Sequence, residues 1–197
     1  GSKEVSDDYI AQVKTLSVQP ELMKTAGKAL KIVYTPLHGS GNKPVRRILK
    51  EIGIENVYVV KEQELPDPNF STVKVPNPED PGAFVLAIKL ADEVGAKVIF
   101  ATDPDCDRVG IAVKNKAGEY ELLTGNQTGM LLLDYICSQR VKHGKMPADP
   151  VMVKTIVTMD MGEQIATHYG LRTINVLTGF KFIGEQIGKL EKQGKAD

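Results

Sequence analysis

Three aspartates stand at every second position near the middle of the chain. Asp103, Asp105 and Asp107 directly follow an apolar run, residues 97–101, whose composition is typical of a buried strand. Carboxylates this close together repel one another and lose hydration at a strand end, so the cluster is hard to explain without a cation. Oxygen ligands favour a hard divalent ion, Mg²⁺ before Ca²⁺ or Mn²⁺. Because Arg108 adds a forked donor suited to phosphate, the stretch indicates chemistry on phosphate esters.

Two other interpretations of this stretch are weaker. A polar turn with aspartates capping the backbone needs only one or two of them. A calcium loop of the EF-hand type needs Gly at its sixth position and Glu at its twelfth. Those positions hold Arg108 and Lys114 here, so the calcium loop fails at both.

The composition limits the partners that the protein can have. The chain has 197 residues, enough for one or two domains, and its 25 acidic and 25 basic residues balance. We therefore expect no nucleic-acid or membrane partner held by bulk charge, and no apolar stretch approaches the ~18 residues that span a bilayer. Cys106 and Cys137 form neither a metal-ligand spacing nor a disulfide framework, which favours the reducing cytoplasm.

The elements around the aspartates alternate between strand and helix. Strands are predicted at 31–35, 56–60 and 97–103, with helices at 44–51 and 82–94 between them. This alternation predicts a mainly parallel α/β sheet, with ligands beyond the carboxyl ends of its strands, where the aspartates stand. Further predicted elements are helices at 7–16, capped by Ser6, and 20–29, a proline-rich loop at 61–81, and a hairpin of strands 109–113 and 119–122.

A second unit of the same kind follows. The pattern predicts helices at 125–139, 161–169 and 179–190 and strands at 151–157 and 172–177. We therefore expect two consecutive three-layer α/β units with mainly parallel mixed sheets, residues 1–117 and 118–197. By its size and alternation, the second unit is expected to be incomplete at its C-terminus.

Several motifs of this chain resemble those of the α-D-phosphohexomutases, a family that includes phosphoglucomutases, phosphomannomutases and phosphopentomutases. Residues 103–108 resemble the metal loop of that family, Asp-x-Asp-x-Asp-Arg. Residues 178–184, Thr-Gly-Phe-Lys-Phe-Ile-Gly, resemble a sugar-phosphate loop of its third domain. Residues 35–39 and 76–79 resemble signatures of its second domain. The His-Gly and Gly-Phe-Lys variants point to the glucose or pentose branch rather than to the bacterial phosphomannomutases.

The resemblance implies an internal segment of a four-domain enzyme, covering its second domain and most of its third. The phosphoserine motif of the first domain, the phosphate clamp of the fourth and the sugar-hydroxyl loop do not occur in this sequence. The implied enzyme is a cytoplasmic isomerase, an intramolecular phosphotransferase of carbohydrate metabolism. It interconverts hexose 1-phosphate and hexose 6-phosphate through a phosphoserine and a bisphosphate intermediate, with Mg²⁺ as cofactor and glucose 1,6-bisphosphate as activator. Without its first and fourth domains, the segment is expected to be inactive.

The resemblance also implies roles for particular residues of the metal loop. Asp103, Asp105 and Asp107 are the implied Mg²⁺ ligands, which would let the ion neutralise phosphoserine oxygens and polarise phosphorus. Arg108 is the implied catalytic and substrate-binding residue, because its guanidinium would hold phosphate charge beside the metal.

Further substrate contacts are implied in the second unit. Thr178, the backbone of Gly179 and Lys181 would contact the sugar phosphate at a helix start, where free N–H groups favour anions. The alternative for Lys181 is a solvated lysine, but a cation is mildly disfavoured in the first turn of a helix. Lys154 stands among apolar residues, and we expect it either to reach the active cleft or to have a structural role.

Two supporting residues and two rival functions stay open. His38 either faces the cleft or makes a structural hydrogen bond, and Glu79 is a candidate support for the metal loop. The chain could be a metal- and sugar-phosphate-binding module without catalysis. It could also be a metal-dependent phosphatase, with Asp103 and Asp105 as nucleophile and acid. The third aspartate with its arginine, together with the Thr-Gly-Phe-Lys loop, argues against the phosphatase.

Overall fold

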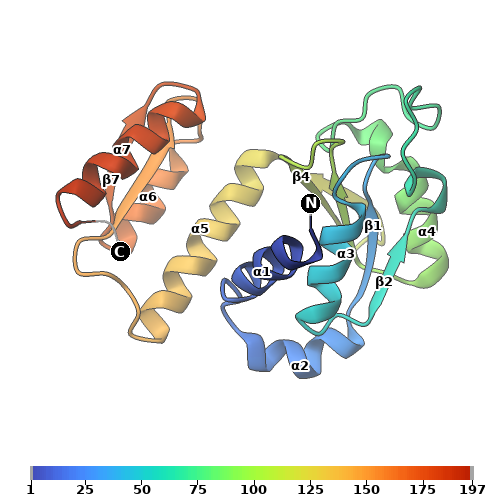
Figure 1. The fold of residues 1–197 in the computed structure, drawn as a ribbon, viewed down its shortest axis with the longest axis horizontal. Coiled ribbons are helices and arrows are strands. Elements are labelled where there is room, and N and C mark those ends of the chain that lie inside the picture. The colour runs from blue at the N-terminus through green and yellow to red at the C-terminus, as the bar shows by residue number, and fades with distance from the viewer. Residues whose placement is uncertain (1, 196–197) are drawn as a thin grey trace. The chain divides into compact units, whose positions relative to one another are not determined.

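The computed structural model describes residues 2–195, which divide after residue 125 into two compact units (Figure 1). The two units are described separately below. The outer ends of the two predicted domains, residue 1 and residues 196 and 197, lie outside the described residues. We expected the domains to divide after residue 117, whereas the compact units divide after residue 125. The hairpin strand at residues 120–123 pairs with the sheet of the first unit. The first unit therefore extends beyond residue 117.

The first unit is built on a five-stranded mixed sheet with the strand order β2-β1-β3-β4-β5. Strands β1, β2 and β3 are parallel, and β4 and β5 add an antiparallel edge. Four of the five residues of β1 are buried because a central strand is covered on both faces. The mixed α/β sheet expected from the sequence is thus confirmed. The strand bounds are β1 (Lys31–Thr35), β2 (Asn56–Val59), β3 (Val98–Thr102), β4 (Val109–Lys114) and β5 (Tyr120–Leu123).

Four helices and two short 3₁₀ helices complete the first unit. The hydroxyl of Ser2 accepts a hydrogen bond from the Val5 amide at 3.3 Å, so Ser2 caps α1. The prediction that Ser6 caps this helix is wrong, because Ser6 lies within the helix. Gly95 ends α4 with a φ of 70°, a left-handed conformation that glycine adopts easily. The bounds are α1 (Lys3–Lys14), α2 (Pro20–Ala29), α3 (Asn42–Glu51), η1 (Lys61–Gln63), η2 (Pro81–Phe84) and α4 (Val85–Val94).

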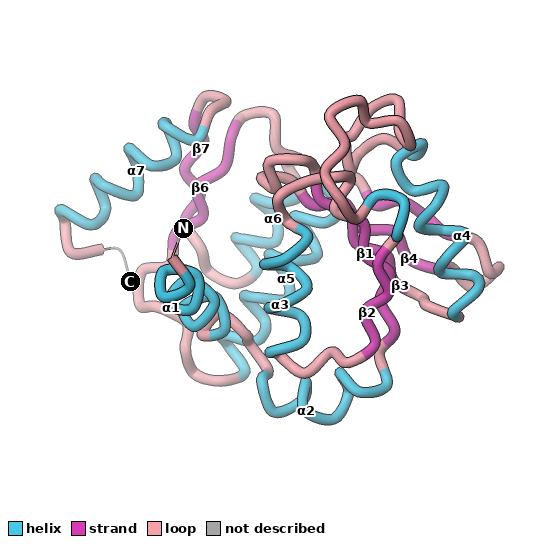
Figure 2. Tube along the Cα trace, turned by 45° about the vertical axis from the view of Figure 1, so that its right-hand side comes forward, coloured by secondary structure: helices cyan, strands magenta, loops and turns pink. Residues whose placement is uncertain are grey.

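The sheet of the first unit is covered by hydrophobic side chains on both faces. Successive strand residues point to opposite faces, so Ile32 and Val33 enter different clusters. Val33 packs with Ile99 and with the buried Phe84 at the start of α4, whereas Ile32 packs with Leu49 of α3. Figure 2 shows α3 and α4 on opposite sides of the strands. The carboxyl end of β3, which the aspartates follow, therefore belongs to a three-layer arrangement of helix, sheet and helix.

The second unit has a two-stranded parallel sheet and three helices. Its elements follow the predicted alternation: α5 (Gly125–Lys142), β6 (Val151–Thr155), α6 (Met161–His168), β7 (Arg172–Val176) and α7 (Phe180–Lys192). None of the helices within residues 2–195 combines the length and the apolar character needed to cross a bilayer.

Candidate metal and phosphate site

The three aspartates of the predicted metal site come together directly beyond β3. One carboxylate oxygen from each of Asp103, Asp105 and Asp107 lies within 4.8 Å of the other two. Asp103 follows the last strand residue and is 1% exposed, whereas the other two are exposed. The site thus has one ligand anchored in the first unit and two that face solvent.

A tight turn in the loop brings the carboxylates together. The Cys106 amide donates to the Asp103 carbonyl at 3.0 Å, and Cys106 itself has a φ of 61°. The left-handed region costs about 1–2 kcal/mol for a residue with a side chain. Such local strain is typical of functional loops, where the surrounding structure imposes the conformation.

Arg108 engages both carboxylate oxygens of Asp103. Its amide donates to Oδ1 at 3.0 Å and its Nε donates to Oδ2 at 2.7 Å. Burial acts to raise the pKa of Asp103, but these hydrogen bonds from Arg108 outweigh burial, so the pKa is lowered. Nε also lies 3.6 Å from a carboxylate oxygen of Asp107. Arg108 is therefore placed at the cluster, as the sequence predicts.

The donor set fits a hard divalent cation. A hydrogen bond with Asp103 and the nearby charge of Asp105 raise the pKa of Asp107. Both causes follow from the closeness of the three carboxylates, and a divalent cation would relieve the repulsion between their charges. The three converging side chains offer only oxygen, the ligand that Mg²⁺ prefers.

The turn after β1 supports the metal loop from one side. The amide and hydroxyl of Ser40 both donate to the Pro104 carbonyl, at 2.8 and 3.1 Å. A Cβ atom on Gly39 would lie 2.5 Å from Pro104 Cα, and one on Gly41 would lie 2.7 Å from the Cys106 sulfur. Both positions therefore require glycine. The short Gly-x-Gly pattern at residues 39–41 is the sequence signal of this contact.

His38 has a structural environment. Its Nδ1 lies 2.8 Å from the Leu65 carbonyl and its Nε2 lies 2.7 Å from the Thr72 hydroxyl. A carbonyl only accepts, so Nδ1 carries the proton, and in the neutral ring Nε2 accepts from Thr72. The His38 amide also donates to the Gln63 carbonyl at 2.9 Å. These bonds favour the structural alternative and tie the proline-rich loop to the turn that supports the metal loop.

The segment at residues 76–79 lies against β4, the strand that follows the metal loop. A Cβ atom on Gly110 of β4 would lie 2.1 Å from the buried Pro78 carbonyl, so the two backbones are in close contact. Glu79 is exposed. The pKa of Arg108 is raised chiefly by its hydrogen bond with Asp103, and the charge of Glu79 contributes weakly. Glu79 thus acts on the arginine through charge, and Pro78 packs against β4 two residues after that arginine.

The predicted sugar-phosphate loop follows β7 in the second unit. Gly179 precedes α7 with a φ of 129°, and among the described residues no side chain makes a capping hydrogen bond at the start of that helix. Thr178 and Lys181 are exposed, and the Lys181 ammonium lies 4.8 Å from the centre of the Phe182 ring. Phe180, between Thr178 and Lys181, is 78% exposed. A helix start with a nearby lysine favours an anion.

Lys154 is buried within the second unit. Its side chain is 5% exposed, and Nζ donates to the Thr158 carbonyl at 3.1 Å. Nζ also lies 3.4 Å from Glu163 and 3.6 Å from Asp160. Lys154 lies at the carboxyl end of β6 and pairs in register with Asn175 of β7. Because the strands are parallel, Lys154 and the sugar-phosphate loop share one edge of the small sheet.

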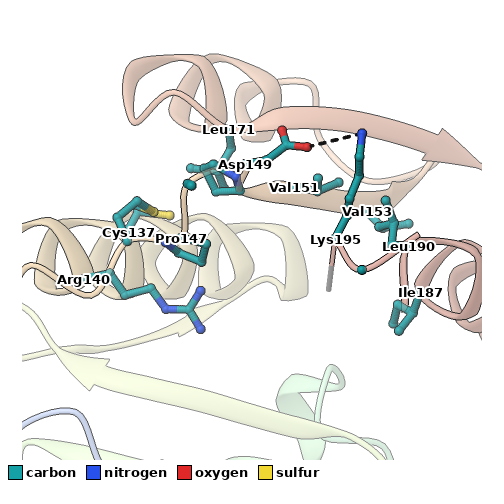
Figure 3. A pocket seen from close by; sticks show the side chains of 14 residues that line it. Cys137, Arg140, Pro147, Asp149, Val151, Val153, Leu171, Ile187, Leu190 and Lys195 are labelled. Carbon is teal, nitrogen blue, oxygen red and sulfur yellow. Dashed lines mark ion pairs between the residues drawn. The ribbon is translucent and has the colours of Figure 1, made fainter. Parts of the chain in front are cut away.

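A cavity of about 400 Å³ lies at the other edge of this sheet. Figure 3 shows Val151 at the start of β6, Leu190 of α7, and an ion pair in which Lys195 Nζ lies 3.9 Å from Asp149. None of the residues predicted to contact the substrate lines this cavity. The cavity is therefore separate from the predicted substrate site.

The fold and the site define an α/β protein with an acidic loop beyond its sheet. Residues 7–118 match the family described as phosphoglucomutase/phosphomannomutase, alpha/beta/alpha domain II, and residues 124–193 match domain III of the same family. The chain belongs to the phosphoglucomutase/phosphomannomutase family, which confirms the resemblance drawn from the motifs.

Individual relatives agree with this assignment. A phosphoglucomutase of Staphylococcus aureus (strain MRSA252) is 35% identical over 189 residues, which are 96% of this chain and 33% of that protein. The chain thus spans about a third of the length of that curated relative.

Two solved structures share the fold at lower identity. A phosphoglucomutase/phosphomannomutase family protein from Burkholderia thailandensis is 20% identical with a TM-score of 0.65, covering 96% of this chain and 36% of that one. An N-acetylphosphoglucosamine mutase from Aspergillus fumigatus is 14% identical with a TM-score of 0.57, covering 87% of this chain and 36% of that one.

Proposed function

We propose that this chain is the metal-binding and sugar-phosphate-binding segment of a phosphoglucomutase-type isomerase. The whole enzyme interconverts hexose 1-phosphate and hexose 6-phosphate through a phosphoserine and a bisphosphate intermediate. The observation that carries the proposal is the convergence of three carboxylates within 4.8 Å beside the guanidinium of Arg108. Membership of the family supports the reaction class.

The proposal gives the residues of the first unit two tasks. Asp103, Asp105 and Asp107 hold a divalent ion, which when bound supplies charge neutralisation and Lewis acidity at a phosphoryl group. Arg108 holds phosphate oxygens and contacts the reacting group, so we assign it as the catalytic residue of this segment. The turn at residues 38–41 holds the loop in place, so that little reorganisation is needed when the ligand binds.

In the second unit, we propose that Thr178, Gly179 and Lys181 bind the sugar phosphate. The exposed start of α7 and the lysine in its first turn both favour a phosphate. Lys154 stays a candidate at the same edge of the small sheet, and its neighbours Asp160 and Glu163 balance its charge until a ligand arrives.

Cofactor, partners and location complete the proposal. The Aspergillus fumigatus mutase has been crystallised with GlcNAc-6P and magnesium, and a variant of it with glucose 1,6-bisphosphate. We propose Mg²⁺ and the same type of bisphosphate here, with a hexose or pentose phosphate as substrate. The first and fourth domains of the longer protein would supply the phosphoserine and the distal phosphate clamp. The free Cys106 and Cys137 are compatible with a cytoplasmic location.

Calorimetry on the segment tests the metal site. Mg²⁺ should bind weakly, because water fills the coordination positions that the three aspartates leave open. Asp105→Asn should weaken binding by roughly tenfold or more, since it removes a charged ligand. The exposed Asp8, outside the loop, provides a matched control. Equal Mg²⁺ binding by Asp105→Asn and Asp8→Asn would contradict the metal assignment.

A coupled assay for glucose 6-phosphate tests the reaction. The segment should give no turnover with glucose 1-phosphate, Mg²⁺ and glucose 1,6-bisphosphate, because the phosphoserine and the distal phosphate clamp belong to other domains. Positioning by such groups supplies most of the catalysis in phosphoryl transfer. The full-length protein should be active, and Asp107→Ala in that protein should abolish activity. Release of inorganic phosphate by the segment would favour a phosphatase instead, and binding without turnover by the full-length protein would favour a non-catalytic module.

A further inference from the structure

One neighbour, Arg108, donates to both carboxylate oxygens of Asp103. Arg108 donates its amide to Oδ1 at 3.0 Å and its Nε to Oδ2 at 2.7 Å, so each carboxylate oxygen already has a donor. The carboxylate is 1% exposed, so water is excluded from it. The buried aspartate of the proposed metal site is therefore neutralised internally.

A guanidinium and a divalent cation on the same buried carboxylate are in conflict. Both are positive, and both would lie within about 2–3 Å of the same carboxylate group, which brings the two cations close to each other. Two positive charges this close repel strongly where solvent does not screen them. Binding of a cation to Asp103 must therefore weaken its ion pair with Arg108.

We propose that Arg108 is the internal counter-ion of Asp103 in the metal-free protein and that the metal displaces it. The displaced guanidinium then becomes available to a phosphate of the ligand. This inference rests on the proposed function and adds a link between metal binding and phosphate binding to it. Because Arg108 bonds Asp103 through its side-chain Nε, displacement adds that donor to those that the guanidinium already offers a phosphate.

The surroundings of Arg108 permit this exchange. Its side chain is 50% exposed, so the guanidinium can turn outward without disturbing the core. Within residues 2–195, its ion pairs are with Asp103 and Asp107 alone, and the second is long at 3.6 Å. The backbone N–H bond to Oδ1 is independent of the guanidinium. Asp103 therefore keeps one donor that holds its carboxylate in place while the side chain of Arg108 leaves.

Two roles for Arg108 predict opposite effects of its removal. If the guanidinium orients Asp103 for the metal, its loss should weaken metal binding. If it competes with the metal, its loss should strengthen binding, because the buried carboxylate then lacks a counter-ion. The sign of the change in affinity separates the two roles.

Calorimetry with Mg²⁺ alone measures that sign. Arg108→Gln keeps a hydrogen-bond donor but removes the charge, and it should bind Mg²⁺ roughly tenfold more tightly, within the usual range of coupling between neighbouring sites. Arg108→Lys keeps the charge and should stay close to the wild type. Arg140→Gln makes the same change of net charge on α5 and should leave the affinity unchanged.

The outcomes are distinct. Unchanged or weaker binding by Arg108→Gln, beside measurable binding by the wild type, overturns the displacement and leaves the metal site standing. Tighter binding by Arg140→Gln of the same size would show a bulk-charge effect and would also overturn it. If neither the wild type nor Arg108→Gln binds Mg²⁺, the proposed function fails together with this inference.

A second measurement uses the wild type and does not depend on the folding of a variant. The Nε–H resonance of Arg108 in ¹⁵N NMR should shift and exchange faster with solvent when Mg²⁺ is added, because its acceptor is lost. Unchanged Nε–H exchange at Mg²⁺ saturation would show that the ion pair persists and would overturn the displacement.

Discussion

The two units differ in how well they bury their hydrophobic side chains. In the first unit the central strand is buried and each face of the sheet carries a hydrophobic cluster, with Tyr34, Phe84 and Ile99 at most 1% exposed. In the second, α7 has no buried residue at all within its described length. Large apolar side chains of this unit stay exposed, including Leu131, Leu132, Ile156, Val157, Met161, Leu177 and Phe180.

The difference follows from sheet size. A sheet of five strands has two broad faces, which several helices can cover. A sheet of two parallel strands has faces no wider than one helix, so fewer side chains can be buried against it. The metal loop therefore stands on a rigid base, as a site that must hold three like charges together requires. The predicted sugar-phosphate loop follows a sheet of only two strands, which gives it less support. Exposed apolar surface of this kind is typical of faces that pack against other protein surface.

Hydrogen exchange should show the largest difference between the units. Amides of β1 and β3 open only with global unfolding, whereas those of β6 and β7 open locally, because few buried contacts hold them. We expect exchange in residues 31–35 and 98–102 to be at least about 100-fold slower than in residues 151–155 and 172–176. Mass spectrometry of peptides can measure this, and better protection of the second set would reverse the comparison.

Two phenylalanines provide a matched test of packing. Phe84 is 1% exposed beside α4, so Phe84→Ala should lower the free energy of unfolding by about 3–5 kcal/mol. Phe180 is exposed at the start of α7, so Phe180→Ala should change it by less than about 0.5 kcal/mol. Urea unfolding followed by circular dichroism can measure both. A large loss at Phe180 would mean that the second unit is better packed than its exposure indicates.

Two glycines should respond to alanine in opposite directions. Gly39→Ala places a Cβ against the backbone of Pro104 and Asp103, so it should destabilise the protein by about 1–3 kcal/mol and weaken Mg²⁺ binding. A Cβ on Gly188 of α7 meets nothing within 4 Å, so Gly188→Ala should stabilise by about 0.5–1 kcal/mol through helix propensity. Thermal unfolding and calorimetry can check both. A tolerated Gly39→Ala would show that the turn does not constrain the metal loop.

The smallest expected effect is the pH response of the proline-rich loop. Hydrogen bonds from the hydroxyl and amide of Ser71, and from the Asn69 amide, lower the pKa of Asp67 to about 2. A lowered folded-state pKa contributes stability above the unfolded pKa near 3.9, and that stability is lost as the pH falls through about 2. A ¹³C NMR titration of the Asp67 carboxyl should therefore have its midpoint near 2. A midpoint near 4 would show that these bonds do not form in solution.

Much of the local structure could be predicted from the sequence. The strand at residues 31–35 was predicted with the bounds of β1, because a run of apolar residues followed by proline leaves few alternatives. The first helix was misplaced because Ser2 and Ser6 are equally good caps by type, and only the observed hydrogen bond distinguishes them. The helix at 82–94 was predicted as one element, whereas a 3₁₀ turn precedes α4, because Pro81 favours a tight first turn.

By itself, the sequence determined the family and predicted the chemistry. Three aspartates and an arginine at fixed spacing after an apolar strand predict an oxygen site for a cation beside a phosphate-binding group. Only the tertiary structure decided what holds that site together. The contacts of Ser40 with Pro104, of Pro78 with Gly110 and of His38 with Leu65 join residues 27 to 64 positions apart. Such contacts depend on which loops meet at the edge of a sheet, and periodicity and local propensity carry no information about that meeting.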